Sequence, residues 1–136
     1  DEEVRHQSRR RDPVRADEHG AWLASRLEAG ERCRLYVACV NGEPIGQARL
    51  DLDETGAAEI SVALAAAARG RGLGAALISL ASERGSRELG ARRVAAVVRE
   101  GNDASYRAFL RAGYVDAGPA VGDLPGTVRL LWKRDS

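Results

Sequence analysis

The chain has 136 residues, enough for one domain with an ordinary hydrophobic core, and its net charge of +1 gives no general electrostatic reason to bind nucleic acid. No apolar run in the sequence is long enough to span a bilayer, and no signal peptide is visible. We therefore expect a single cytoplasmic domain over residues 1–136, with no nucleic-acid or membrane partner.

The cysteine and histidine residues restrict which disulfide bonds and metal sites the chain can form. Cys33 and Cys39 lie around one expected strand, which places them too far apart for a disulfide bond, so we expect reduced thiols. No Cys/His pairing has the spacing of metal ligands, and no metal site is predicted. The chain begins on charged residues without a Met, which favours an N-terminally trimmed chain or one domain of a longer protein.

The first part of the chain predicts a helix followed by antiparallel strands. Trp22, Leu23 and Leu27 would share one face of a helix over Ala16–Ala29. Asn41-Gly42 is a typical two-residue hairpin turn between two strands. The strands expected here are Leu35–Val40, Ile45–Leu52 and residues 57–64.

The second part of the chain predicts helices alternating with strands. Leu73, Leu77 and Leu80 recur at helical spacing within residues 72–89, and the apolar run Val94–Val98 is typical of a strand buried on both faces. The remaining elements are a helix from Gly101-Asn102 to Ala112 and strands at Tyr114–Ala117 and Thr127–Lys133. This order predicts an α/β fold whose sheet has mixed strand directions.

The stretch Arg69-Gly70-Arg71-Gly72-Leu73-Gly74-Ala75 connects an expected strand to an expected helix. The first N–H groups of a helix lack partners within the helix and carry partial positive charge. Glycines without a Cβ let a ligand approach those N–H groups closely, and the arginines add full charge. The stretch therefore predicts a binding site for a pyrophosphate group. A sharp turn in an arginine-rich chain is the competing interpretation.

Two motifs in register resemble the GNAT superfamily of acetyl-CoA-dependent N-acetyltransferases. The first is Arg-x-x-Gly-x-Gly, matched by Arg69, Gly72 and Gly74. The second is Asn-x-x-(Ala/Ser)-x-x-x-(Tyr/Phe) followed by Gly-(Phe/Tyr), and the residues that match it are Asn102, Ser105, Phe109, Gly113 and Tyr114. The resemblance implies a mixed central sheet, flanked by helices, in which two strands splay apart. The family's first strand would precede residue 1.

The resemblance also implies how acetyl-CoA would bind. Pantetheine would lie between the splayed strands, at the backbone of Val62 and Leu64, and the pyrophosphate would bind the amides from Gly70 to Ala75. The implied cofactor-binding residues are Val62, Leu64, Arg69, Gly70, Arg71, Gly72, Leu73, Gly74, Ala75, Asn102, Ser105 and Phe109.

Transfer to an amine requires the neutral form of that amine, so a base or a water chain has to accept a proton. Glu59 is the first candidate base, although the position that matches histone-type relatives is Ala58, and a slip of one residue reverses the strand face. A solvated glutamate at a strand end is the competing interpretation. His19 is the second candidate, because its pKa suits proton transfer.

The family's usual acid, which protonates the departing thiolate, is a tyrosine at the position of Phe109, and phenylalanine has no hydroxyl. Tyr106 lies one turn earlier on roughly the same helix face and is the candidate replacement.

The expected acceptor is the primary amine of a small molecule. Short stretches such as Glu18–Trp22 and Glu59–Val62 resemble acetyltransferases that act on nucleotide-linked amino sugars. A protein or peptide N-acetyltransferase, a non-catalytic acyl-CoA-binding module and a dinucleotide-binding fold are the alternatives. A homodimer is left open.

Overall fold

A computed structural model describes residues 21–26, 32–40, 42–65, 72–119 and 126–134 of the chain. These residues form a seven-stranded sheet with the order β1-β2-β3-β4-β5-β7-β6. The strands are β1 (Ala21–Arg26), β2 (Cys33–Val40), β3 (Glu43–Leu52), β4 (Ala58–Leu64), β5 (Arg93–Arg99), β6 (Val115–Pro119) and β7 (Thr127–Lys133). Every neighbouring pair is antiparallel except β4 and β5, which are parallel. The prediction of an α/β fold with a mixed sheet is therefore confirmed.

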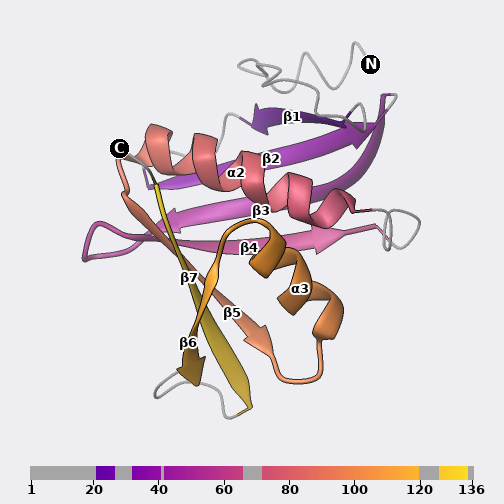
Figure 1. The fold of residues 1–136 in the computed structure, drawn as a ribbon. Coiled ribbons are helices and arrows are strands. Elements are labelled where there is room, and N and C mark those ends of the chain that lie inside the picture. The colour runs from indigo at the N-terminus through magenta and orange to yellow at the C-terminus, as the bar shows by residue number, and fades with distance from the viewer. Residues whose placement is uncertain (1–20, 27–31, 41, 66–71, 120–125, 135–136) are drawn as a thin grey trace.

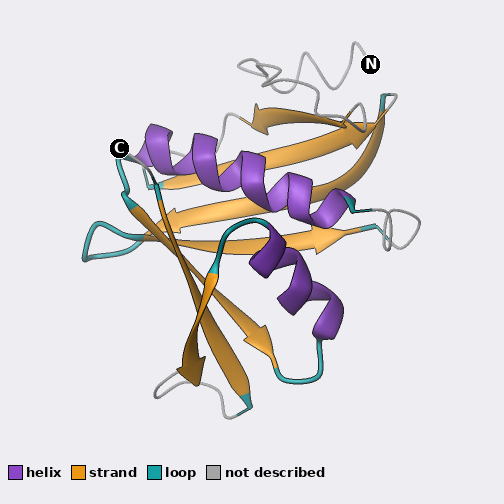
Figure 2. Ribbon diagram, in the orientation of Figure 1, coloured by secondary structure: helices purple, strands orange, loops and turns teal. Residues whose placement is uncertain are grey.

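The sheet has two parts that diverge from each other. Figure 1 shows β1–β4 lying side by side, while β5, β7 and β6 turn away from them below. Helix α2 (Leu73–Leu89) lies across β2, β3 and β4, and α3 (Asp103–Arg111) packs beside the N-terminal end of α2 (Figures 1 and 2). A dinucleotide-binding fold would need an open, mostly parallel sheet, so this topology excludes that alternative.

The core lies between α2 and one face of the sheet. Leu73, Leu77 and Ile78 of α2 are buried against alternate residues of the strands, among them Leu50 and Ile60. Along β4 the burial alternates, with Ala58 and Ile60 buried and Glu59 and Ser61 exposed. This period of two is the pattern that predicted the strand.

One prediction about secondary structure is wrong. Residues 21–26 lie within the expected helix Ala16–Ala29, but they form the edge strand β1, which pairs with β2 from Ala21↔Val40 to Arg26↔Leu35. A short apolar segment can satisfy either pattern, and the open edge of β2 supplies backbone partners that sequence reasoning does not see. The rest of that expected helix, with His19, lies outside the described residues.

Candidate active site

The parallel pairing between β4 and β5 ends soon after it begins. Only two pairs join them, Ala58↔Val94 and Glu59↔Ala95, although β4 continues to Leu64 and β5 continues to Arg99. Beyond Glu59, β4 stays paired with β3 as far as Gly46↔Leu64. The splay between two central strands that the resemblance implied is therefore present.

The hydrogen-bond alternation of the β3–β4 ladder determines which backbone groups face this splay. The N–H of Ala65 donates to the carbonyl oxygen of Ile45 at 2.8 Å, which makes Leu64 and Gly46 a non-hydrogen-bonded pair. Because the ladder alternates, the N–H and C=O groups of Leu64 and Val62 point away from β3. They point to the side where β5 has diverged, so no described strand pairs with them.

Gly46 permits the close approach of β3 to this part of β4. A Cβ on Gly46 would lie 2.7 Å from the carbonyl oxygen of Ala63 and 3.0 Å from a side-chain carbon of Leu64. Any larger residue would push the two strands apart. A glycine inside an expected strand was the sequence signal for this contact.

The N-terminus of α2 opens onto the same region. Gly72 occupies the N-cap position with a φ of 75°, a left-handed conformation that favours glycine. Among the described residues, no side chain caps the helix, and its first turn carries no acidic residue. The free N–H groups of this turn are therefore available to an anion.

The end of β4, the start of α2 and one face of α3 border an open cavity of about 730 Å³. The first turn of α2 touches α3, since a Cβ on Gly74 would lie 3.6 Å from the Cβ of Ala108. The described residues that line the cavity are Val62, Ala63, Leu64, Gly72, Gly74, Ala75, Ile78, Asn102, Ala104, Ser105, Arg107, Ala108 and Arg111.

Asn102 forms the N-cap of α3 beside this cavity. Its side-chain Oδ1 accepts a hydrogen bond from the N–H of Ser105 at 3.3 Å. The cap uses the amide oxygen, and no described residue accepts a hydrogen bond from the NH₂ group, which could donate to a ligand.

The structure brings together most of the expected binding residues that it describes. Seven of them line this same cavity: Val62, Leu64, Gly72, Gly74, Ala75, Asn102 and Ser105. Arg69, Gly70 and Arg71 lie outside the described residues and stay predictions. The lining also includes α3 residues that the sequence reasoning missed, among them Arg107 and Arg111. Their spacing from Ala104 and Ala108 along one helix face was the available signal.

A comparison with protein families agrees with this geometry, because residues 2–114 match the Acetyltransferase (GNAT) family. The chain belongs to the GNAT acetyltransferase family. A comparison with curated protein sequences found no match.

Solved GNAT structures share the fold. The GNAT domain of S. lividans PAT is 28% identical with a TM-score of 0.65, and the alignment covers 76% of this chain and 61% of that one. The aminoglycoside acetyltransferase AAC(6')-Ib in complex with coenzyme A is 25% identical with a TM-score of 0.67, covering 78% and 69%. A Vibrio cholerae spermidine N-acetyltransferase chimera, at 19% identity and a TM-score of 0.66, supports the fold alone, covering 76% and 68%.

The side chains of two expected GNAT cofactor residues lie in the core. Leu73 is 2% exposed, and Phe109 is 4% exposed with its ring 5.0 Å from that of Tyr114 in an edge-to-face arrangement. Neither side chain is among the described residues that line the cavity, so each supports the cavity wall by packing in the core. Leu73 was expected to bind through its backbone amide, which burial of its side chain does not test, so that role stays a prediction.

Tyr106, the candidate for the GNAT thiolate-protonating acid, points elsewhere. Its hydroxyl donates to Oδ2 of Asp116 on β6 at 2.8 Å, and the described cavity wall does not include it. The hydrogen bond to Asp116, with burial and the carboxylate charge, raises the pKa of Tyr106 and makes it a weaker acid. In this structure the Tyr106 hydroxyl is therefore directed to β6 and away from the described cavity wall, and its role as the acid stays a prediction. Tertiary contact with β6 decided the direction.

Glu59, the candidate base, lies at the last paired position before the splay. It is exposed, and its side chain points to the face of the sheet opposite the buried Ala58 and Ile60. Val62 follows three residues later, at the cavity. Glu59 therefore lies where the two strands begin to diverge, but outside the described cavity wall.

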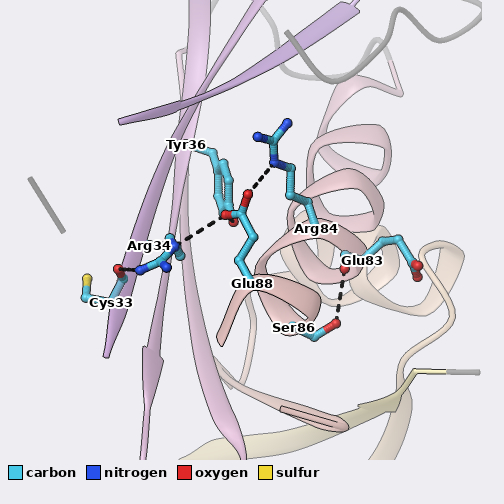
Figure 3. Close-up of polar contacts among 7 residues, drawn as sticks. All are labelled: Cys33, Arg34, Tyr36, Glu83, Arg84, Ser86 and Glu88. Atoms are coloured by element: carbon cyan, nitrogen blue, oxygen red, sulfur yellow. Dashed lines mark hydrogen bonds and ion pairs between the residues drawn. The ribbon is translucent and has the colours of Figure 1, made fainter. Parts of the chain in front are cut away.

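A second polar cluster lies at the other end of α2 (Figure 3). Glu88 accepts hydrogen bonds from the Tyr36 hydroxyl at 2.7 Å and from Nε of Arg84 at 2.8 Å, and Nε of Arg34 lies 3.3 Å away. Burial raises the pKa of Glu88, but these donors and the arginine charges outweigh it and hold that pKa below its ordinary value. The cluster attaches α2 to β2.

Among the described residues, no helix is long and apolar enough to cross a membrane. The same part of the chain holds no group of His, Cys, Asp and Glu side chains suited to a metal ion.

Proposed function

We propose that this chain is an N-acetyltransferase that moves the acetyl group of acetyl-CoA to a primary amine of a small molecule. The observation that carries the proposal is the cavity, which joins free backbone groups of β4 to the uncapped N-terminus of α2. A coenzyme that carries a diphosphate at one end and an amide-containing arm at the other needs both features.

The residues present fit such a coenzyme. The N–H groups at Gly72, Gly74 and Ala75 would bind the diphosphate, helped by the Arg69–Arg71 segment. The backbone of Val62 and Leu64 would pair with the amides of the pantetheine arm as a neighbouring strand would. The free NH₂ of Asn102 would donate to a carbonyl of that arm. The coenzyme supplies an acetyl thioester, and N–H groups on β4 would polarise its carbonyl.

The amine would approach from the face of the sheet opposite α2, because α2 and the core cover the other face and no described helix covers this one. Glu59 lies on that face and would accept a proton from the ammonium form of the acceptor, directly or through water, so that the neutral amine attacks the thioester. Loss of the thiolate would proceed without a tyrosine acid, since a thiol of pKa ~8.5 is a tolerable leaving group.

An acetyl-CoA turnover screen tests the proposal. Thiol release would be followed over UDP-linked amino sugars, aminoglycosides, polyamines and peptides, with acetyl-CoA binding measured in parallel. We expect amine-dependent release with at least one small-molecule class. Binding with no turnover on any amine would favour the acyl-CoA-binding alternative, and turnover on peptides alone would favour the peptide N-acetyltransferase.

The acceptor classes in the screen follow from the sequence and from the relatives. AAC(6')-Ib has been solved with coenzyme A and kanamycin, an example of a small-molecule amine in a similar fold. The nucleotide-linked amino sugars follow from the short sequence stretches and have no support among the relatives reported above.

The role of Glu59 has its own test. Replacement by Gln should lower kcat about 100-fold near neutral pH, and the loss should shrink at high pH as the amine loses its proton unaided. Glu54→Gln, which removes an exposed carboxylate from the β3–β4 turn, is the matched control. An unchanged pH–rate profile in the Glu59 variant would shift the role of base to His19.

A further inference from the structure

Two arginines on α3 have no role in the mechanism above. Arg107 and Arg111 both line the cavity and lie four residues apart, which places them next to each other on one helix face. Ala108, between them in the sequence, lies against Gly74 in the first turn of α2. The two guanidinium groups are therefore presented beside the proposed diphosphate site.

Neither arginine has an ion pair or a hydrogen bond among the described residues. Asp103 lies one turn before Arg107, but no ion pair joins them. The described wall of the cavity contains no Asp or Glu, and the first turn of α2 has no acidic residue. Two neighbouring cations repel each other where no described residue forms an ion pair with them, so this part of the wall favours a bound anion.

We propose that Arg107 and Arg111 bind the 3′-phosphate of the coenzyme and make this chain select coenzyme A over its dephospho form. The inference rests on the proposed function, because it assumes that acetyl-CoA occupies this cavity. A phosphate monoester carries a charge of about −1.5 to −2 at neutral pH, which two guanidinium groups balance. Its terminal oxygens also match the planar fork of arginine, which binds phosphate through paired hydrogen bonds.

The diphosphate is a poorer match for this pair. The glycines and free N–H groups of α2 suit a group that has to approach the backbone closely. Arg107 and Arg111 extend from a different helix on long side chains and need no such approach. The structure therefore provides two kinds of anion site in one cavity, for a ligand with two separate phosphate groups.

Binding of acetyl-CoA and of acetyl-3′-dephospho-CoA, measured by titration calorimetry, tests the inference. The proteins compared would be the unmodified chain, Arg107→Gln, Arg111→Gln and the double variant. We expect the unmodified chain to bind acetyl-CoA about tenfold or more tightly than the dephospho form, and the double variant to lose most of that preference. Affinity for the dephospho form should be the same in all proteins, and 0.5 M salt should reduce the preference.

Arg93→Gln is the matched control, because it removes an exposed positive charge at the end of β5 away from the cavity. It should leave the preference intact, and circular dichroism would verify that all variants are folded. Equal affinity of the unmodified chain for both ligands would overturn the inference and leave the proposed function standing. An equal loss of affinity for both ligands in the arginine variants would also overturn the inference, because Arg107 and Arg111 would then bind the diphosphate that both ligands carry. Binding of neither ligand would remove the proposed function as well.

Discussion

The two ends of helix α2 differ in what they contact. At the C-terminal end, Glu88 is bound by Tyr36, Arg84 and Arg34, and the Ser82 hydroxyl lies 2.6 Å from that of Tyr114. At the N-terminal end, Gly72, Gly74 and Ala75 border a cavity, and no described side chain caps the helix. We name these the closed end and the open end of α2.

The contacts at the closed end stabilise the fold, and the free backbone groups at the open end are available for binding. At the closed end the polar side chains bond to other side chains, and the carbonyls of Arg87 and Ser86 accept from the N–H groups of Gly90 and Ala91, whereas the open end leaves backbone N–H groups for a ligand. Substitutions at the closed end should therefore lower the free energy of unfolding with little change in coenzyme affinity. Substitutions at the open end should do the reverse.

The largest effect on stability is expected for Leu50→Ala. Leu50 is fully buried, and its side chain lies within 2.9 Å of the position that a Cβ on Gly85 would take, near the closed end. Loss of its methyl groups should lower the free energy of unfolding by about 3 kcal/mol, measured in urea. Leu110→Ala, at a site that is 40% exposed, is the control and should cost much less. A matching loss of acetyl-CoA affinity in folded Leu50→Ala protein would contradict the assignment of stability to the closed end and binding to the open end.

At the open end, Gly72→Asp should abolish measurable coenzyme binding, with an affinity loss of at least about 100-fold. It places a carboxylate beside the proposed diphosphate, and such like-charge contacts cost several kcal/mol. Gly72→Asn is the control, because Asn and Asp tolerate the left-handed φ of 75° similarly and only Asp is charged. Equal affinities in the two variants would contradict an anion site at this helix end.

The polar cluster at the closed end predicts a pH dependence of stability. The pKa of Glu88 is lowered in the folded chain, so its contribution is present above its unfolded pKa and is lost as the pH falls through the folded value. Glu88→Gln should lower the free energy of unfolding by about 1–2 kcal/mol at pH 7. The difference in the free energy of unfolding between the variant and the unmodified chain should shrink below about pH 4, near the pKa of an ordinary glutamate. A difference that stays constant from pH 7 to pH 3 would show that the charge of Glu88 does not matter.

The smallest effect is expected for Asn102→Asp, at the cavity but on α3. Asp is as good an N-cap as Asn, so the hydrogen bond from the N–H of Ser105 is kept and stability should change by less than about 0.5 kcal/mol. The NH₂ donor is lost, and coenzyme affinity should fall about fivefold. Asn102→Ser, which also keeps a cap but removes the NH₂ group without adding charge, would separate the loss of this donor from the effect of the added charge. Unchanged affinity in both variants would limit Asn102 to capping.

The sequence by itself determined the elements whose signals are local. Apolar alternation over residues 57–64, the helical spacing of Leu73 and Leu77, and the expected strand Thr127–Lys133 all correspond to observed elements. The motif residues Gly72, Gly74 and Asn102 were placed at one site, because a glycine-rich helix start and an Asn cap carry their geometry in their residue types.

Only the tertiary structure decided the features that depend on a neighbouring element. Ala21–Arg26 became a strand because β2 had a free edge. Tyr106 turned to Asp116 because β6 lies beside α3, and Phe109 packed on Tyr114 in the core. The presentation of Arg107 and Arg111 to the cavity depends on which face of α3 meets α2. Periodicity specifies which residues share a face, but the partner that covers or exposes that face is set by contacts between segments far apart in the chain.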